Sequence, residues 1–335
     1  MKITDEVRKD RRLDKLEQET KDLRKKYRVA VRELNKKERE QDFTSTIASK
    51  REIFTITPYR SGGVSEATAV MVASDWHIEE KVLTEEVNGL NEYNLNISRE
   101  RAVKFFQRGL RLVNVFNKDI KINTLILALL GDFFSGSIHD ELAEENYLAP
   151  ADSATCALEY LESGIRFLLK NSTLKIIIPC VPGNHGRMTA KPRTANESGN
   201  SLERFMYINL AERFKDEKRV TFIIPRAKHV YLQVYGMTIR FMHGHTVRYH
   251  GGVGGVSIPL NKAVPQWDLL IPADVTVLGH FHQHLDGGRW LINGSLIGYN
   301  TFALDNKFSY EEPKQAFFLI DKKRGKTVVA PILFS

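Results

Sequence analysis

The chain has 335 residues, of which 42% are hydrophobic and 27% charged, a balance that excludes a disordered or fibrous protein and predicts a sizeable core. Its net charge of +8 favours an acidic partner such as nucleic acid, without requiring one. The chain has only two cysteines, so we expect no disulfide framework. Its charged N-terminus predicts no secretory signal, and no apolar stretch is long enough for a membrane span, so we expect a cytoplasmic protein.

Residues 1–42 are predicted to form a charged helix. They contain 15 Lys or Arg, 11 Asp or Glu, and neither Pro nor Gly. Apolar and small residues recur at alternating steps of three and four, which is a heptad pattern. Three interpretations are open: a solvated helix partly docked on the body, a homo-oligomer formed through residues 13–34, and direct DNA binding. The heptad positions are Leu13, Leu16, Thr20, Leu23, Tyr27, Ala30 and Leu34.

A linker is expected at 43–68, with Pro58, Gly62 and Gly63 as breaks, followed by a body at 69–335. The first half of the body alternates apolar runs with helical periods, which predicts a βαβ sheet with helical crossovers. The strands are expected at 69–74, 124–130 and 174–181, and the helices at 98–117, 153–169 and 201–214.

After residue 220 the strands follow one another more closely, which predicts a second sheet built largely of antiparallel pairs. The fold class is therefore α/β, a four-layer α/β/β/α sandwich with a charged N-terminal helix. The later strands are expected at 220–224, 230–235, 238–242, 275–278, 290–293, 317–321 and 327–333.

Residues that can bind a metal follow five of these apolar runs. The sequences are "DWH" at 75–77, "GD" at 131–132, "GNH" at 183–185, "HGH" at 243–245 and "GHFH" at 279–282. Each alone has an ordinary interpretation as a turn or a helix cap. Because ligand sites form beyond the carboxyl ends of strands in open α/β sheets, five in succession predict one site at a common edge.

The residue types indicate the chemistry. Carboxylate, imidazole and amide oxygen suit Mn²⁺, Fe²⁺ or Zn²⁺, and the absence of thiolate argues against a structural zinc site. The ligands are too many for one ion. Two divalent ions bridged by a carboxylate and a hydroxide would use them all, and such a pair catalyses in-line hydrolysis of phosphate esters.

In the order of these five motifs, residues 69 to about 333 resemble the calcineurin-like metallophosphoesterases, closest in character to phage and bacterial members of the DNA-repair exonuclease type. The resemblance implies a two-metal site, with Mn²⁺ as the expected ion and Mg²⁺, Fe²⁺ or Zn²⁺ as alternatives. One ion would take Asp75, His77 and His282, and the other Asn184, His243 and His280, with Asp132 between them. His185 would act near the leaving group, as a general acid or a phosphate contact.

Two residues depart from the family pattern. An acidic residue usually follows G-N-H, but here Gly186 and Arg187 follow. Either another carboxylate orients His185, or Arg187 takes over phosphate stabilisation, or the acid role is weaker. Trp76 is larger than usual in the first motif and is expected either to wall the site or to stack against a base.

The substrate is less determined than the chemistry. Basic residues after the third and fourth motifs, among them Lys191, Arg193 and Arg248, favour a nuclease acting on DNA or RNA. The alternatives are a phosphomonoesterase or small cyclic-nucleotide phosphodiesterase, and a non-catalytic scaffold acting through its N-terminal helix. The segment His139–Glu141 is expected to be an exposed acidic loop or a substrate-reading element. His245 is a further ligand candidate, whereas His284 is expected to lie outside the site.

Overall fold

The computed structural model describes residues 2–49, 54–56, 65–138, 140–249 and 255–335. By its internal contacts the chain divides into two units, Met1–Glu52 and Ile53–Ser335. The first contains one continuous helix, α1 (Lys2–Ser49). The predicted helix therefore forms, but it continues seven residues beyond position 42, so that the start of the expected linker is helical. Pro58, Gly62 and Gly63 lie outside the described residues.

The second unit contains two six-stranded sheets. The first sheet has the order β12-β11-β2-β3-β4-β5, in which β2 to β5 are parallel and β11 and β12 are antiparallel additions at one edge. Its strands are β2 (Glu66–Ala73), β3 (Lys121–Leu129), β4 (Lys175–Pro179), β5 (Val220–Ile223), β11 (Lys314–Asp321) and β12 (Gly325–Leu333). The expectation that the strands at 220–224, 317–321 and 327–333 join the second sheet was wrong.

The second sheet has the order β1-β6-β7-β8-β10-β9. It is mixed, because β7, β8 and β10 are parallel neighbours, as are β1 and β6. The prediction of a largely antiparallel sheet was therefore also wrong. Its strands are β1 (Phe54–Ile56), β6 (Val230–Val234), β7 (Met237–Met242), β8 (Val275–Leu278), β9 (Leu285–Asp286) and β10 (Trp290–Ile292).

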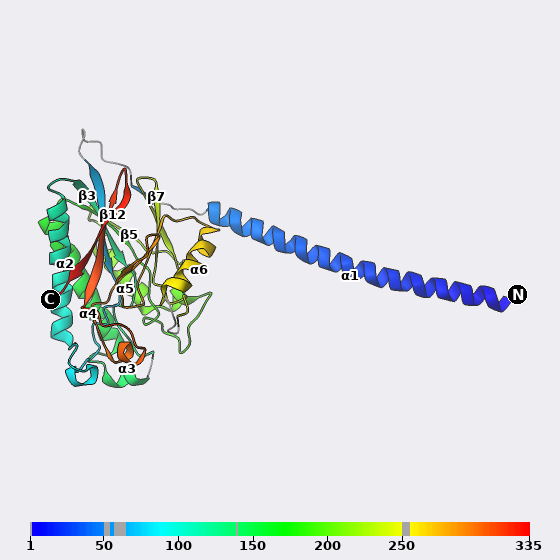
Figure 1. The fold of residues 1–335 in the computed structure, drawn as a ribbon, viewed down its shortest axis with the longest axis horizontal. Coiled ribbons are helices and arrows are strands. Elements are labelled where there is room, and N and C mark those ends of the chain that lie inside the picture. The colour runs from blue at the N-terminus through cyan, green and yellow to red at the C-terminus, as the bar shows by residue number, and fades with distance from the viewer. Residues whose placement is uncertain (1, 50–53, 57–64, 139, 250–254) are drawn as a thin grey trace. The chain divides into compact units, whose positions relative to one another are not determined.

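Three apolar clusters hold these layers together. Alternation along β2 sends Ala69 and Met71 to the helix-covered face of the first sheet, and Val70 and Val72 to the other face. That second face packs on the second sheet, whose outer face packs in turn against Leu260 of α6. The predicted four-layer α/β/β/α sandwich is confirmed, and Figure 1 shows α2 and α6 on opposite sides of the strands.

The main helices begin where the sequence supplies a cap. The side chain of Asn94 accepts hydrogen bonds from the backbone of Asn96 and Ile97 at the start of α2, and Ser201 caps α5 in the same way. Pro150 occupies the first turn of α4, where its missing N–H costs nothing. The helices of the body are α2 (Leu95–Phe116), α3 (Asp140–Glu145), α4 (Pro150–Asn171), α5 (Leu202–Arg213), α6 (Ser257–Asp268) and α7 (Thr301–Asp305), with 3₁₀ turns at Thr84–Val87 and Glu197–Asn200.

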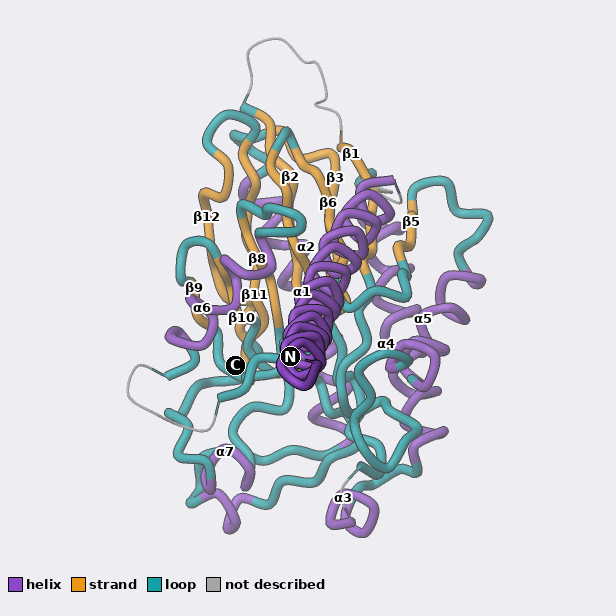
Figure 2. Tube along the Cα trace, turned by 90° about the vertical axis from the view of Figure 1, so that its right-hand side faces the viewer, coloured by secondary structure: helices purple, strands orange, loops and turns teal. Residues whose placement is uncertain are grey.

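The topology brings the predicted ligand loops to one end of the two sheets. β2, β3 and β4 are parallel, as are β7 and β8, so the loops that follow them leave from common edges. Figure 2 shows loops together with α3 and α7 gathered at one end of the strands. Within the described part of the chain, no helix combines the length and apolar character that crossing a bilayer requires.

Candidate metal centre

The predicted ligands form overlapping groups at this end of the sheets. Asp75, His77 and His282 offer ligand atoms that all lie within 4.8 Å of one another. Asp132, His243 and His280 form a second group of the same size. The first group consists of the three residues expected for one ion, and the second contains His243 and His280, expected for the other ion, together with Asp132.

Asn184 and Asp132 tie the second group together. The His243 Nε2 atom lies 2.9 Å from Asp132 Oδ2 and 3.2 Å from Asn184 Oδ1. A third group consists of Asp132, His77 and His185, whose candidate ligand atoms also lie within 4.8 Å of one another. Asp132 therefore lies between the two predicted ligand sets, which is the position expected of a bridging carboxylate. The association of His185 with His77 was not predicted from the sequence.

Backbone packing fixes this proximity. The loops after β2 and β3 are joined by hydrogen bonds from the Asp75 and Trp76 amides to the carbonyl oxygens of Gly131 and Asp132, at 2.9 and 2.8 Å. A Cβ atom on Gly183 would lie 2.0 Å from Asp132 Oδ1, so only glycine fits beside this carboxylate. The glycine of "GNH" is thus explained by the close approach of two loops.

Several candidate ligands have a left-handed backbone. The φ angles are positive at Asp75, His77, Asp132, His280 and His282, between 45° and 72°. Such a conformation costs non-glycine residues roughly 1–3 kcal/mol each and is concentrated at functional sites. Each of these residues immediately follows a strand or lies in the loop beyond it, so the strained backbone turns the side chain back toward the common edge.

Hydrogen bonds orient the imidazoles. The His243 Nδ1 atom lies 2.6 Å from the carbonyl oxygen of Leu130, which can only accept, so Nδ1 carries the proton. The His77 Nδ1 atom lies 3.1 Å from Glu80 Oε1 and 2.6 Å from Ser135 Oγ. In both rings Nε2 is left facing the other candidate ligands. A carboxylate behind the imidazole, as Glu80 is here, is the usual support of a metal-binding histidine.

Glu80 was missed in the sequence, although it lies three residues after His77 in "DWHIEE". Its buried carboxylate also accepts a hydrogen bond from the Ser135 hydroxyl. Burial would raise the pKa of Glu80, but His77 and the hydrogen bonds lower it to about 2. Glu80 is therefore ionised at neutral pH and holds the proton of His77 on Nδ1.

The charges of the site are strongly coupled. Burial opposes the charged form of His243, yet Asp132 and Asp75 raise its pKa to about 10. Burial, with smaller effects of neighbouring charges, raises the pKa of Asp75 to about 6 and lowers that of His282 to about 3. Burial would also raise the pKa of Asp132, but the neighbouring histidines hold it well below its usual range. Without a cation, the ionised Asp132 thus lies beside a protonated His243, and a metal ion bound there would have to replace that proton.

A buried carboxylate, Glu203, lies next to Gly186 and was not singled out in the sequence. A Cβ on Gly186 would lie 2.8 Å from Glu203 Cβ, so the glycine makes room for this side chain. Glu203, buried in the first turn of α5, accepts hydrogen bonds from the Phe133 amide at 2.8 Å and the Gly183 amide at 2.6 Å. It thereby joins the "GD" and "GNH" loops. An acidic residue in a first helical turn is too common to have predicted this role.

The predicted catalytic residues lie beside the centre. The backbone amide of His185 donates to Asp132 Oδ1 at 2.9 Å, and its Nδ1 atom lies 3.1 Å from the carbonyl oxygen of Ser135. Burial is the main cause that lowers the pKa of His185 to about 4. One guanidinium nitrogen of Arg187 donates to the carbonyl oxygen of Asn184 at 3.1 Å.

Other candidates lie elsewhere. Trp76 is fully buried against Phe105 and Phe133, with its Nε1 atom 3.1 Å from Gln315 Oε1, so the prediction that it stacks against a base was wrong. His245 falls outside the three groups and pairs with Glu197.

The remaining loop candidates contribute nothing to the three groups. His284 lies outside them, as expected, and Asp140 and Glu141 begin the exposed helix α3. His139 and His250 lie outside the described residues.

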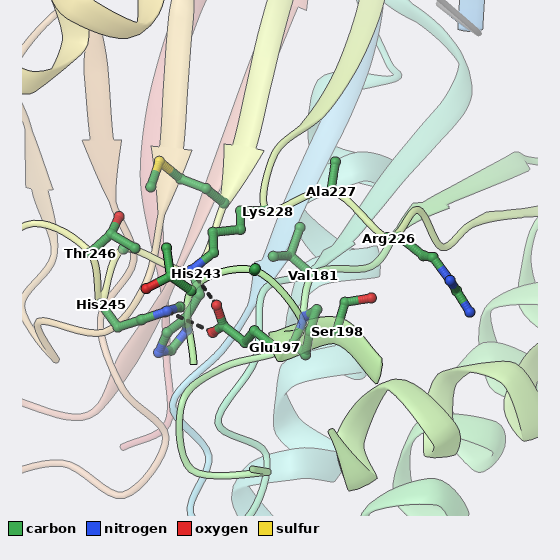
Figure 3. Close-up of a pocket in the computed structure, with 14 residues that line it drawn as sticks. Val181, Glu197, Ser198, Arg226, Ala227, Lys228, His243, His245 and Thr246 are labelled. Atoms are coloured by element: carbon green, nitrogen blue, oxygen red, sulfur yellow. Dashed lines mark ion pairs between the residues drawn. The ribbon is translucent and has the colours of Figure 1, made fainter. Parts of the chain in front are cut away.

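Two small pockets adjoin the second ligand group. One, of about 190 Å³, is lined by Asn184, His280 and His245 together with two arginines, Arg187 and Arg193. The other adjoins His243, and Figure 3 shows Glu197 there between Lys228 and His245, paired with both. The His245 Nε2 atom lies 2.7 Å from Glu197 Oε1. The space next to the candidate metal centre is thus bordered by two arginines and by Glu197, whose carboxylate pairs with Lys228 and His245.

No family model matches the chain, and no curated protein matches it. Among solved structures, it is similar to a hypothetical protein from Pyrococcus horikoshii OT3, with 14% identity, TM-score 0.39 and coverage of 80% of this chain and 89% of that one. A dimetal phosphatase from Danio rerio has 9% identity, TM-score 0.37 and coverage of 80% and 99%. Vps29 from Chaetomium thermophilum has 10% identity, TM-score 0.31 and coverage of 79% and 95%.

Proposed function

We propose that this protein is a two-metal phosphoesterase and that its substrate is the phosphodiester backbone of nucleic acid. The observation that carries the first part is the pair of His/carboxylate groups on either side of Asp132. A buried cluster of this kind is costly without a cation, because its lone pairs face one another.

The side chains present fit divalent ions. The Nε2 atoms of His77 and His282 lie 3.2 Å apart, and hydrogen bonding already commits His77 Nδ1 to its proton. On the other side, His243 Nε2 faces a carboxylate oxygen and an amide oxygen. One ion would be held by Asp75, His77 and His282, the other by Asn184, His243 and His280, with Asp132 shared. Nitrogen and oxygen donors without thiolate suit Mn²⁺, Fe²⁺ or Zn²⁺, which supply Lewis acidity and a nucleophile at neutral pH.

The protein's own residues would position the ester. His185 lies next to Asp132, and because its Nδ1 proton is directed at the Ser135 carbonyl, Nε2 is the position that can act on a leaving group. Arg187 is anchored to the backbone of Asn184, so its charge is held close to the second ligand group. We assign His185 to the leaving group and Arg187 to the phosphate oxygens.

The second part, nucleic acid as substrate, is supported by the pocket that contains Arg187 and Arg193. Within the described structure, the buried Nε atom of Arg187 and the buried Nδ1 atom of His245 have no hydrogen-bond partner. Both residues line this pocket, which also includes the candidate ligands Asn184 and His280. A chain with phosphates on both sides of the scissile bond would place a neighbouring phosphate or sugar there, and the net charge of +8 agrees with such a substrate.

A substrate panel tests both parts. Metal-depleted protein is supplied with Mn²⁺, Mg²⁺ or Zn²⁺ and given linear DNA, bis-p-nitrophenyl phosphate and p-nitrophenyl phosphate. We expect metal-dependent hydrolysis of DNA and of the model diester. Hydrolysis of the monoester alone would refute the nuclease assignment but keep the phosphoesterase, and no hydrolysis of any ester would leave the non-catalytic scaffold as the better account.

A pair of variants tests the pocket separately. Replacing Arg193 with Ala should lower the rate of DNA hydrolysis while leaving bis-p-nitrophenyl phosphate hydrolysis unchanged, because the small diester has no neighbouring phosphate. Lys170→Ala on α4, outside the pocket, removes the same charge and is the matched control. Equal effects of both variants on DNA would show that net charge, rather than the pocket, governs the rate.

A further inference from the structure

The heptad face of α1 is exposed along its described length. The leucines at positions 13, 16, 23 and 34 are 52–67% exposed, and Tyr27 is 71% exposed. A long helix whose apolar residues form one narrow stripe is the usual component of a coiled coil. The apolar stripe does not determine whether a partner helix runs parallel or antiparallel to α1, but the charged residues beside the stripe distinguish the two directions.

The heptad positions follow from the stripe. Leu13, Thr20, Tyr27 and Leu34 occupy the a positions, and Leu16, Leu23 and Ala30 the d positions. The residues that flank the stripe are then those at g and e, whose charges set partner and orientation in coiled coils. The g positions hold Arg12, Glu19, Lys26 and Glu33, and the e positions hold Glu17, Arg24, Val31 and Glu38.

A parallel in-register pair of α1 helices would be partly repulsive. Each g residue would face the e residue five positions later on the second copy. Arg12 with Glu17 and Glu19 with Arg24 attract, but Lys26 would face Val31. Glu33 would face Glu38, a like-charge contact that occurs twice in a symmetric pair.

In one register of an antiparallel pair, the three kinds of flanking contact within residues 12–33 are all attractive. In an antiparallel pair, each core layer contains an a residue of one helix and a d residue of the other, and the sum of their two residue numbers defines the register. With a sum of 43, Leu13 faces Ala30, Leu16 faces Tyr27, and Thr20 faces Leu23 of the second copy. In antiparallel coils g faces g and e faces e. The flanking pairs are then Arg12 with Glu33, Glu19 with Lys26, and Glu17 with Arg24, each formed twice.

Sliding the helices by one heptad reverses this result. With layer sums of 50, Lys26 faces Lys26 of the second helix, Arg24 faces Arg24, and Glu19 faces Glu33, so each of these contacts is between like charges. With layer sums of 36, Glu19 and Glu17 each face their own copies, and Arg12 faces Lys26. Like charges at such positions are destabilising, so of these three antiparallel registers the charge pattern favours the one with layer sums of 43.

We infer that α1 is a homodimerisation element and that it pairs with α1 of a second copy of this chain in the antiparallel direction, with Leu13 opposite Ala30. The paired segment, residues 13–30, is about 27 Å long at 1.5 Å per residue. The inference concerns α1 alone and is independent of the catalytic proposal.

Glu33→Arg discriminates between the two directions because it has opposite effects in them. In the antiparallel pair it turns both Arg12–Glu33 attractions into repulsions, whereas in the parallel pair it turns both Glu33–Glu38 repulsions into attractions. Sedimentation equilibrium of the full-length protein should show a dimer that dissociates roughly tenfold more readily in the variant. Asp22→Arg makes the same change of charge at an outward-facing position of α1 and should leave dissociation within about twofold.

The double variant Arg12→Glu with Glu33→Arg provides the rescue. It restores the antiparallel pairs with their charges exchanged, so the dimer should regain the wild-type dissociation constant. A stronger dimer with Glu33→Arg alone would show the parallel arrangement. A wild-type chain that stays monomeric across the concentration series would overturn the inference altogether.

Spin labels measure the direction independently. A label at position 36, introduced as Lys36→Cys with Cys156→Ser to remove the half-buried thiol, lies outside the paired segment. In the antiparallel register the two labels would be about 44 Å apart along the helix axis. A distance below about 20 Å would indicate parallel helices and contradict the inference.

Discussion

Replacement of Glu203 should destabilise the body and disturb the candidate metal centre together. Its two carboxylate oxygens accept hydrogen bonds from the Phe133 and Gly183 amides, in the two loops that carry Asp132 and Asn184. Burial and the nearby Asp132 raise the pKa of Glu203 to about 7, so the carboxylate is largely ionised at pH 8, where hydrogen bonds to a charged group contribute about 1.5–3 kcal/mol each. Glu203→Ala removes both and leaves two amides without these acceptors, so the free energy of unfolding should fall by about 3–6 kcal/mol.

The measurement is equilibrium urea unfolding at pH 8, with Mn²⁺ binding measured on the same variants. Glu203→Gln keeps one acceptor oxygen and should lose about half as much stability. Glu212→Ala, on the same helix but exposed, should change stability by less than about 0.5 kcal/mol. If Glu203→Ala loses less than about 1 kcal/mol and binds Mn²⁺ like the wild type, the argument that this side chain joins the two loops is wrong.

His185→Ala should lower turnover of every phosphoester at least tenfold and leave Mn²⁺ content unchanged; a loss of bound Mn²⁺ would make His185 a ligand instead. Glu80→Gln should weaken Mn²⁺ affinity roughly tenfold or more, measured by metal titration, because the imidazole of His77 loses its ionised partner; unchanged affinity would contradict this role. His229, away from the centre, has its pKa lowered from 6.5 to about 4 by burial and, to a lesser extent, by Arg240 and Lys228. Because the unfolded chain binds this proton at a higher pH than the folded protein, the free energy of unfolding should fall by up to about 3 kcal/mol as the pH is lowered from 6.5 to 4. In a profile of melting temperature against pH, His229→Phe should therefore show a smaller decrease over this range. An unchanged decrease would refute this.

The sequence was sufficient to predict the order of the layers and to place the candidate ligands that follow strands at one edge. Asp75, Asp132 and Asn184 each come after a parallel strand of the first sheet, and parallel strands end at one edge. Their proximity therefore follows from the topology alone. The same holds for His243 and His280, since β7 and β8 are also parallel.

What could not be predicted depends on contacts between distant segments. Glu203 is recognisable only once α5 packs against the "GD" and "GNH" loops. The burial of Trp76 depends on where α2 places Phe105. Helix α6 was not predicted because Pro259 and Pro265 interrupt its helical pattern.

The parallel pairing of β7 and β8 was also missed. The 32 residues between Met242 and Val275 form the crossover that a parallel pair needs, but its helix, α6, was not recognised in the sequence.

The stoichiometry of bound metal tests the central claim most directly. Metal-free protein is dialysed against Mn²⁺, and the bound metal is counted per chain for the wild type and for Asp132→Asn, with bis-p-nitrophenyl phosphate hydrolysis measured on the same samples. We predict two bound ions per wild-type chain. Asp132→Asn should bind at most one ion and should lose hydrolysis. One ion or none in the wild type, or two ions and full activity in the variant, would contradict a two-metal centre built around Asp132.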